Sequence, residues 1–147
     1  MQIEIKPGSC EDCFAIASVI PEFSSGAYPL QEYKQRILNR QHLILVAFEN
    51  DMPVGFKMGY QKDGENTFYS WLGGVLPQFR KNGIARKLAK EQEKILKENG
   101  FQTLEFKTRN YLKPMLIFGL KNGFNIVEVI KKETESNHRI VLRKTLI

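Results

Sequence analysis

The sequence predicts a single mixed α/β domain (α+β class) with a central β-sheet of about seven strands and about four helices on both faces. Its 147 residues suffice for one domain with a real core and are too few for two ordinary ones. Hydrophobic residues make up 42% and charged residues 26% of the chain, which is typical of globular proteins. Segments of strand and helix periodicity follow in the order β-α-α-β-β-β-α-β-α-β-β. No repeat or linker divides them, so the domain is expected to span 1–147.

The chain is expected to begin with a strand and a short helix. The segment MQIEI alternates between apolar and polar residues, and Pro7 and Gly8 are expected to stop this strand. Ser9 and Asp12 are candidate N-caps of the helix that follows, which is expected to end at Pro21.

A loop, a second helix and a hairpin are predicted next. SSGAYP has loop composition, and LQEYKQRILN carries apolar residues at helical spacing. Two β-rich runs flank Asn50 and Asp51, which predicts an antiparallel hairpin, although this pair is not the strongest turn signal. In the following strand, NTFYSWLGGVL, Gly73 and Gly74 indicate a bulge or a close backbone approach.

The second half is predicted to contain a crossover unit. Residues 84–99 carry an apolar stripe at helical spacing, and Gly100 is a fitting stop. Because TLEFKTRN then reads as a strand, it should lie parallel to the strand that precedes this helix. KPMLIFGLKN predicts a helix with Pro114 in its first turn and Gly123 after its end. FNIVEVIKKE and HRIVLRKTL are the last two predicted strands.

The charge of the chain favours a polyanionic partner. The net charge is +6 and the isoelectric point is near 9.3, which suits either a nucleic acid or a phosphorylated cofactor. Basic residues gather next to one glycine, at Arg80, Lys81, Arg86, Lys87 and Lys90.

Cysteine usage and hydropathy suggest an ordinary cytoplasmic protein. Cys10 and Cys13 form a lone C-x-x-C, for which two reduced thiols are a simpler explanation than a redox centre. The longest apolar run is LILVAF, far below the roughly 20 residues that cross a bilayer, and the N-terminus does not resemble a signal peptide. We therefore expect a cytoplasmic location.

The stretch from strand to basic turn to helix has the physics of an anion site. The first turn of a helix leaves about four backbone N–H groups without intrahelical partners, and the helix dipole adds partial positive charge. Gly83 would let a ligand approach the backbone, small Ala85 would leave room beside it, and Arg80 and Arg86 would add charge. A plain basic helix cap would use the same residue types.

Two motifs resemble the GNAT superfamily of acetyl-CoA-dependent N-acetyltransferases. VLPQFRKNGIARKL contains R-x-x-G-x-A after a strand that ends in V-x-P, and it matches the family's pyrophosphate loop at Arg80, Gly83 and Ala85. LEFKTRN, followed by a helix and LKNGF, resembles the second family signature, a strand ending in Asn110 and a helix ending in Gly123 and Phe. The spacing between those two residues is two longer than the commonest family pattern.

The resemblance implies acetyl-CoA as co-substrate and no metal. Backbone groups at the end of the fourth strand would pair with the pantetheine arm, the N–H groups of the glycine loop would cradle the pyrophosphate, and the asparagine would lie near the cofactor. The implied cofactor-binding residues are Gly73, Gly74, Val75, Arg80, Lys81, Asn82, Gly83, Ile84, Ala85, Arg86 and Asn110.

The resemblance also implies transfer of the acetyl group to a primary amine by direct attack on the thioester. The position of the usual family tyrosine, which protonates the thiolate, is Gly119 here, so Tyr69 and Tyr111 are alternative hydroxyl donors beside solvent. Glu22 is the first candidate base, acting through water, and a solvated loop carboxylate is an equally good explanation of it. Glu105 lies in the middle of a predicted strand and is expected to pair with Lys107 or a helix cation.

The expected acceptor is a small-molecule or peptide amine, with no nucleic acid or membrane as partner and a monomer or homodimer as the assembly. Five aromatic residues could wall the acceptor site or equally belong to the core: Phe23, Tyr28, Tyr33, Tyr69 and Trp71. A non-catalytic acyl-CoA sensor and a basic nucleic-acid-binding module are the competing functions.

Overall fold

The fold is a mixed seven-stranded sheet with two helices on each face, as predicted. The computed structural model describes residues 1–23 and 27–146. Within them the strands are β1 Ile3–Pro7, β2 His42–Glu49, β3 Met52–Gln61, β4 Thr67–Val75, β5 Thr103–Arg109, β6 Asn125–Ile130 and β7 Arg139–Thr145. The helices are α1 Cys10–Ser18, α2 Leu30–Ile37, α3 Ile84–Glu98 and α4 Lys113–Lys121.

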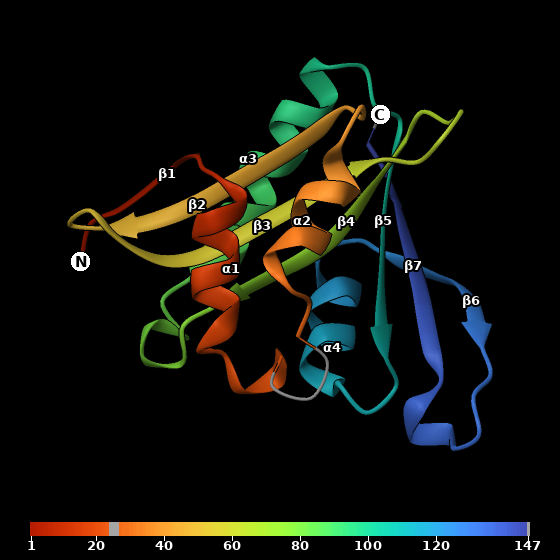
Figure 1. Ribbon diagram of the computed structural model, residues 1–147. Coiled ribbons are helices and arrows are strands. Elements are labelled where there is room, and N and C mark those ends of the chain that lie inside the picture. The colour runs from red at the N-terminus through yellow and green to blue at the C-terminus, as the bar shows by residue number, and fades with distance from the viewer. Residues whose placement is uncertain (24–26, 147) are drawn as a thin grey trace.

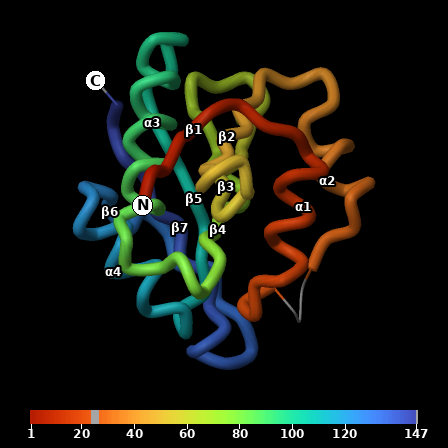
Figure 2. The backbone as a smooth tube through the Cα atoms, turned by 90° about the vertical axis from the view of Figure 1, so that its left-hand side faces the viewer, coloured from red at the N-terminus to blue at the C-terminus, as the bar shows by residue number. Residues whose placement is uncertain are grey.

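The strands lie in the order β1-β2-β3-β4-β5-β7-β6, and every neighbouring pair is antiparallel except β4 and β5. The predicted parallel crossover through α3 is therefore confirmed. In Figure 2 the helices α1 and α2 cover one face of the sheet, and α3 and α4 cover the other. None of the described helices is long and apolar enough to span a membrane.

Local signals account for most element boundaries. The Ser9 side chain accepts a hydrogen bond from the N–H of Asp12, whose carboxylate accepts one from the Ser9 N–H, so Ser9 is the N-cap of α1. Gly100 and Gly123 end α3 and α4 with φ of 84° and 89°, in the left-handed region that glycine adopts without strain. The SSGAYP loop lies partly outside the described residues.

Two details differ from the prediction. The strand β1 continues through Pro7 rather than stopping before it, because Pro7 lies at the end of a sheet-edge strand, where its missing N–H is tolerated. The hairpin turn at Asn50 and Asp51 is better than its sequence suggested. Both residues have positive φ, 49° and 69°, which is the geometry of the type I′ turn that joins antiparallel strands well.

The core consists of two clusters that meet near the middle of the sheet. The larger one joins α1 and α2 to β2, β3 and β4 and includes Phe56, Met58 and Trp71. The smaller one lies under β5, β7 and the C-terminal half of α3, with Leu104 and Leu142 almost completely buried. The strand β4 contributes to both clusters, with Phe68 in the smaller one and Trp71 in the larger one.

Candidate active site

The strands β4 and β5 form an opening in the sheet. They pair over three residues only, Thr67–Tyr69 against Thr103–Glu105, and then diverge, as Figure 1 shows. From residue 70 to 75, β4 is paired with β3 on one side, and its other edge faces the opening. An open strand edge offers backbone groups that can hydrogen-bond an extended amide-containing ligand.

The β4 edge leads directly to the start of α3. Lys81 and Gly83 adopt positive φ, 66° and 75°, and this turns the chain so that the helix begins at Ile84. The N–H of Lys87 makes the first bond of the helix, 3.0 Å to the carbonyl of Gly83. The N–H groups of the preceding turn, at residues 84–86, therefore remain available to an anion.

The surroundings of this turn fit a phosphate-bearing ligand. No described atom lies within 4 Å of the place a Cβ would take on Gly83, so the turn is accessible. The side chains of Lys81, Arg86 and Lys87 are exposed and contribute positive charge. Asn82 has a structural contact within the loop. Its side-chain amide donates hydrogen bonds to the carbonyls of Phe79 and Arg80, at 3.0 and 3.1 Å, and so stabilises the loop conformation.

Arg80 and Glu22 form an ion pair that sequence reasoning did not foresee. The guanidinium donates to both carboxylate oxygens of Glu22 at 2.9 Å, and its Nε donates to the carbonyl of Val75 at 3.0 Å. The hydrogen bonds from Arg80 lower the pKa of Glu22. Glu22 is thus an exposed carboxylate that is already paired, and the pair ties the glycine loop to the segment after α1. Its role as a base stays a prediction.

The paired glycines at the end of β4 allow close packing. The bulge lies earlier than predicted: Gly59 pairs with Ser70 and Met58 with Leu72, which leaves Trp71 as the extra residue. The predicted close backbone approach is present, since a Cβ on Gly74 would lie 2.8 Å from the Ile20 side chain. A Cβ on Gly73 would likewise lie 3.2 Å from the Phe56 carbonyl.

Buried polar atoms occur on the α3 and α4 side of the opening. Gln92 is 1% exposed and donates a hydrogen bond of 3.2 Å to the hydroxyl of Ser70, the first β4 residue beyond the contact with β5. The Gln92 Oε1 and the Thr108 hydroxyl lack a partner among the described residues. Gln92 gives no signal in an apolar pattern because its side chain is polar, although its position falls within the stripe of Leu88 and Leu96.

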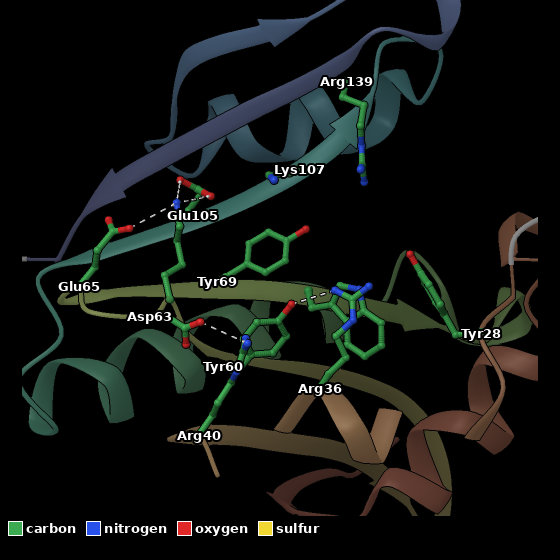
Figure 3. Close-up of a pocket in the computed structure, with 12 residues that line it drawn as sticks. Tyr28, Arg36, Arg40, Tyr60, Asp63, Glu65, Tyr69, Glu105, Lys107 and Arg139 are labelled. Atoms are coloured by element: carbon green, nitrogen blue, oxygen red, sulfur yellow. Dashed lines mark hydrogen bonds and ion pairs between the residues drawn. The ribbon is translucent and has the colours of Figure 1, made fainter. Parts of the chain in front are cut away.

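A cavity of about 440 Å³ lies on the other face of the opening (Figure 3). Of the expected aromatic wall, Tyr28, Tyr69 and Trp71 line it, together with Tyr60. Phe23 instead packs against Phe56, and Tyr33 is a core residue with 2% exposure. The two faces of the opening therefore differ: the turn with unbonded N–H groups belongs to α3, and the cavity lies beside α2.

Of the candidate hydroxyl donors, Tyr69 alone lines the cavity. Burial raises the pKa of Tyr69 to about 12, so its phenol carries its proton at neutral pH. Tyr111 follows β5 and is 51% exposed. Its backbone N–H donates a hydrogen bond of 2.9 Å to the carbonyl of Ser136, so it lies against the β6–β7 connection. At Gly119 a Cβ would lie 2.7 Å from the Phe106 ring, so a tyrosine has no room in this helix packing.

Two further predicted residues have structural partners. Asn110 donates to the carbonyl of Glu135 at 3.1 Å and accepts from Lys113 at 3.2 Å, and so links the end of β5 to the β6–β7 connection. Its assignment to the cofactor stays a prediction. Glu105 pairs with Lys62 and Arg143. The sequence had suggested Lys107 or a helix cation as its partner.

The cysteines confirm the simpler expectation. Cys10 and Cys13 are free and buried. Burial raises the pKa of both thiols, whereas a redox centre needs a lowered one. Within residues 1–23 and 27–146, no cluster of three or more histidine, cysteine or acidic side chains is arranged to hold a metal.

Comparison with known proteins agrees with this geometry. The profile of the Acetyltransferase (GNAT) family matches residues 10–124, which is most of the chain. No curated protein is significantly similar in sequence. The chain therefore combines a clear family signature with a divergent sequence, and it belongs to the GNAT family of acetyltransferases.

Solved structures share the whole fold. The ribosomal-protein-S18-alanine N-acetyltransferase of Escherichia coli superposes with a TM-score of 0.86 at 14% identity, covering 99% of this chain and 94% of its own. The PaiA N-acetyltransferase of Thermoplasma acidophilum, solved in complex with coenzyme A, gives 0.75 at 21% identity and 99% coverage of both chains. Ard1 from Thermoplasma volcanium gives 0.83 at 16% identity, covering 100% of this chain and 99% of its own.

Proposed function

We propose that the protein transfers an acetyl group from acetyl-CoA to a primary amine. The observation that carries this proposal is the continuity of the open β4 edge with the first turn of α3. An extended ligand along residues 70–75 would deliver its pyrophosphate to the free N–H groups of residues 84–86, beside exposed cations. The strand edge suits the pantetheine arm of acetyl-CoA, and the N–H groups of the turn suit its pyrophosphate.

The reaction is a balanced acyl transfer. A C–N bond forms between the acetyl carbon and the amine, the C–S bond breaks, the amine loses a proton and the thiolate gains one. A carbonyl next to the β4 edge would receive hydrogen bonds from backbone N–H groups as negative charge develops. Tyr69 lines the cavity face of the opening, and this position makes it our first choice for the proton donor. The burial that raises its pKa to about 12 makes it a weaker acid than an unperturbed phenol.

The residues that this chain contributes to the donor are mostly backbone groups. Gly73, Gly74 and Val75 supply the strand edge, and residues 81–86 supply the turn. Positioning of amine and thioester in the opening can lower the reaction barrier by on the order of 7–11 kcal/mol.

A second function, binding of acyl-CoA without catalysis, is favoured by one observation. The helix position that carries the usual family tyrosine is Gly119, and it packs against Phe106 and Leu142 without space for a larger side chain. A sensor would need the cofactor site and no proton donor.

Calorimetry and a thiol-release assay together test both functions. We expect acetyl-CoA at a hundredfold excess over its Kd to stabilise the protein by about 2.7 kcal/mol, because it binds only the native state. Thiol release with an amine panel should then exceed release without amine. Binding without release with any amine would favour the sensor, and the absence of binding would contradict both functions.

A further inference from the structure

The cavity beside α2 is lined by more cationic than acidic side chains, and each acidic side chain is paired with a cation. Glu105, 1% exposed, is held by Lys62 at 3.3 Å and by Arg143 at 2.7 Å. Asp63 pairs with Arg40 at 3.4 Å, and Glu65 lies 3.9 Å from Lys62. Each of these carboxylates therefore already has a cationic side chain within 4.0 Å.

Two cations of the cavity have no such partner. Lys107 and Arg139 line it from β5 and β7, and within the described part of the chain neither makes an ion pair. The Arg139 Nε is buried without a hydrogen-bond acceptor among the described residues. The Lys107 ammonium lies 5.5 Å from the ring centre of Tyr69. A buried guanidinium donor without an acceptor costs free energy, and the charges of Arg139 and Lys107 are not balanced by any described carboxylate.

A third cation is held rigidly across the cavity. The Arg36 guanidinium donates to Glu32 and to the hydroxyl of Tyr60, each at 2.9 Å, and lies 4.5 Å from the ring centre of Trp71. Figure 3 shows Arg36 and Tyr28 on one side of the cavity and Lys107 and Arg139 on the side of β5 and β7. Arg36 is already neutralised by Glu32, so the unbalanced charge belongs to Lys107 and Arg139.

We propose that the acceptor is an amine that also carries an anionic group, a carboxylate or a phosphate, held by Lys107 and Arg139. This inference rests on the proposed acetyl transfer and names the acceptor class. The same charges disfavour polyamines and other amines with a second cation, since like charges in a half-buried site repel. The anionic group would be bound at the β5 and β7 side, while the amine reaches the opening past Tyr69.

The test compares amines that differ only in their anionic group. The carboxylate arm is γ-aminobutyrate against γ-aminobutyramide, the phosphate arm is phosphoethanolamine against ethanolamine, and putrescine represents dications. Two readouts are needed: thiol release from acetyl-CoA, and calorimetric binding of each amine to the protein saturated with unreactive CoA. The variants are Lys107→Gln with Arg139→Gln, and Lys94→Gln on the exposed surface of α3 as matched control.

We expect the acidic member of at least one pair to exceed its neutral partner by about tenfold in kcat/KM and in affinity, the worth of one charge-assisted hydrogen bond. Lys107→Gln with Arg139→Gln should abolish that preference and keep the acetyl-CoA affinity, and Lys94→Gln should change neither. Which pair responds tells a carboxylate from a phosphate.

The outcomes separate this inference from the proposed function. Charge-selective binding that depends on Lys107 and Arg139, without thiol release from any amine, supports the anionic site and contradicts acetyl transfer. Thiol release with neutral amines or putrescine at least as fast as with acidic ones overturns the anionic acceptor and supports acetyl transfer. Failure of both acidic amines to bind, or a preference that survives both substitutions, also overturns it.

Discussion

The pair of Arg80 and Glu22 joins two residues that sequence reasoning assigned to separate tasks. Arg80 was expected to face the cofactor and Glu22 to activate the amine, but each satisfies the other through two hydrogen bonds. The side chains of Arg80 and Glu22 are 39% and 46% exposed, so the pair contributes at most about 1 kcal/mol to stability. Its main effect is on protonation, because Glu22 remains a carboxylate at pH values where an unpaired one would begin to titrate.

We therefore predict that Glu22→Gln leaves the neutral limb of the pH–rate profile in place. A group whose pKa is lowered below its usual range cannot produce a limb near neutrality, and the amine itself would account for it. Profiles of kcat/KM between about pH 5.5 and 9 would be compared with those of Glu98→Gln, an exposed control on α3. A fall of about a hundredfold in kcat, with loss of the limb, would instead establish Glu22 as the base.

Lys57 is a residue to which the sequence drew no attention. Lys57 lies on β3 opposite Gly73 of β4 and faces α3. A Cβ on Gly73 would lie 3.5 Å from the Lys57 Cγ, so the lysine side chain packs beside the glycine. Burial lowers its pKa to about 8, with a smaller opposing effect from Glu93. The alternation of MPVGFKMGYQ placed this side chain on one face of a strand, but not under a helix, so its burial depends on tertiary packing.

Replacement of Lys57 by Met should stabilise the protein in a pH-dependent way. Below pH 8 the lysine is charged in both states, so the native state carries the full cost of burying the charge. Between about 8 and 10.5 the native state alone loses the proton, and the cost disappears. The gain of Lys57→Met over the parent, roughly 1–3 kcal/mol at pH 7, should therefore shrink by pH 10. Denaturant unfolding curves at pH 7 and pH 10 measure this gain, with Lys94→Met as the control. An equal gain at the two pH values would contradict the lowered pKa of Lys57.

At the scale of elements, the start of α3 is the best-specified part of the site. Its geometry needs a left-handed residue directly before the first helical turn, and Gly83 provides it with φ of 75°. Gly64, in the β3–β4 turn, has φ of 72° and equally open surroundings. Gly64 and Gly83 thus have nearly the same φ, and Gly64 lies outside the proposed pyrophosphate site, so it serves as a control for Gly83.

Alanine at either glycine should cost about 1–2 kcal/mol of stability, because an L-residue is strained in this conformation. Only Gly83→Ala should also lower the affinity for acetyl-CoA, by about tenfold. The added Cβ would occupy the space through which a ligand approaches the N–H groups of the helix turn. Urea unfolding and calorimetry on both variants separate the two effects. Equal affinity for acetyl-CoA in both variants would remove Gly83 from the cofactor site.

Elements with a local signal could be predicted, and contacts between distant segments could not. The helix ends at Gly100 and Gly123 and the cap at Ser9 depend on neighbours within four residues, so sequence was sufficient. The bulge at Trp71 depends on how β3 pairs with β4, and the partners of Glu105 come from β7 and from the end of β3. The cavity combines side chains from α2, β3, β5 and β7, which no local pattern brings together.

At the scale of the whole molecule, the sheet consists of two halves joined by three residue pairs. The β1–β4 half is packed by α1, α2 and the start of α3, and the β5–β7 half by its own smaller core cluster. A ligand in the opening would contact both halves along their least connected border. Binding should therefore reduce the motion of residues on both sides of the opening, including residues that do not contact the ligand.

Hydrogen exchange should reveal this coupling. With CoA bound, the amides of residues 70–75 and 84–86 should exchange more slowly because they become hydrogen-bonded, and those of 106–109 should follow as the β5 side of the opening is held. The β1–β2 pairing lies at the far edge of the sheet and serves as internal control, since it should change only with global stability. Gly83→Ala should reduce the protection of 84–86 first, because it acts on the turn and not on the strand edge. Protection confined to 84–86, with 70–75 unchanged, would mean that the pyrophosphate binds while the open edge of β4 is not used.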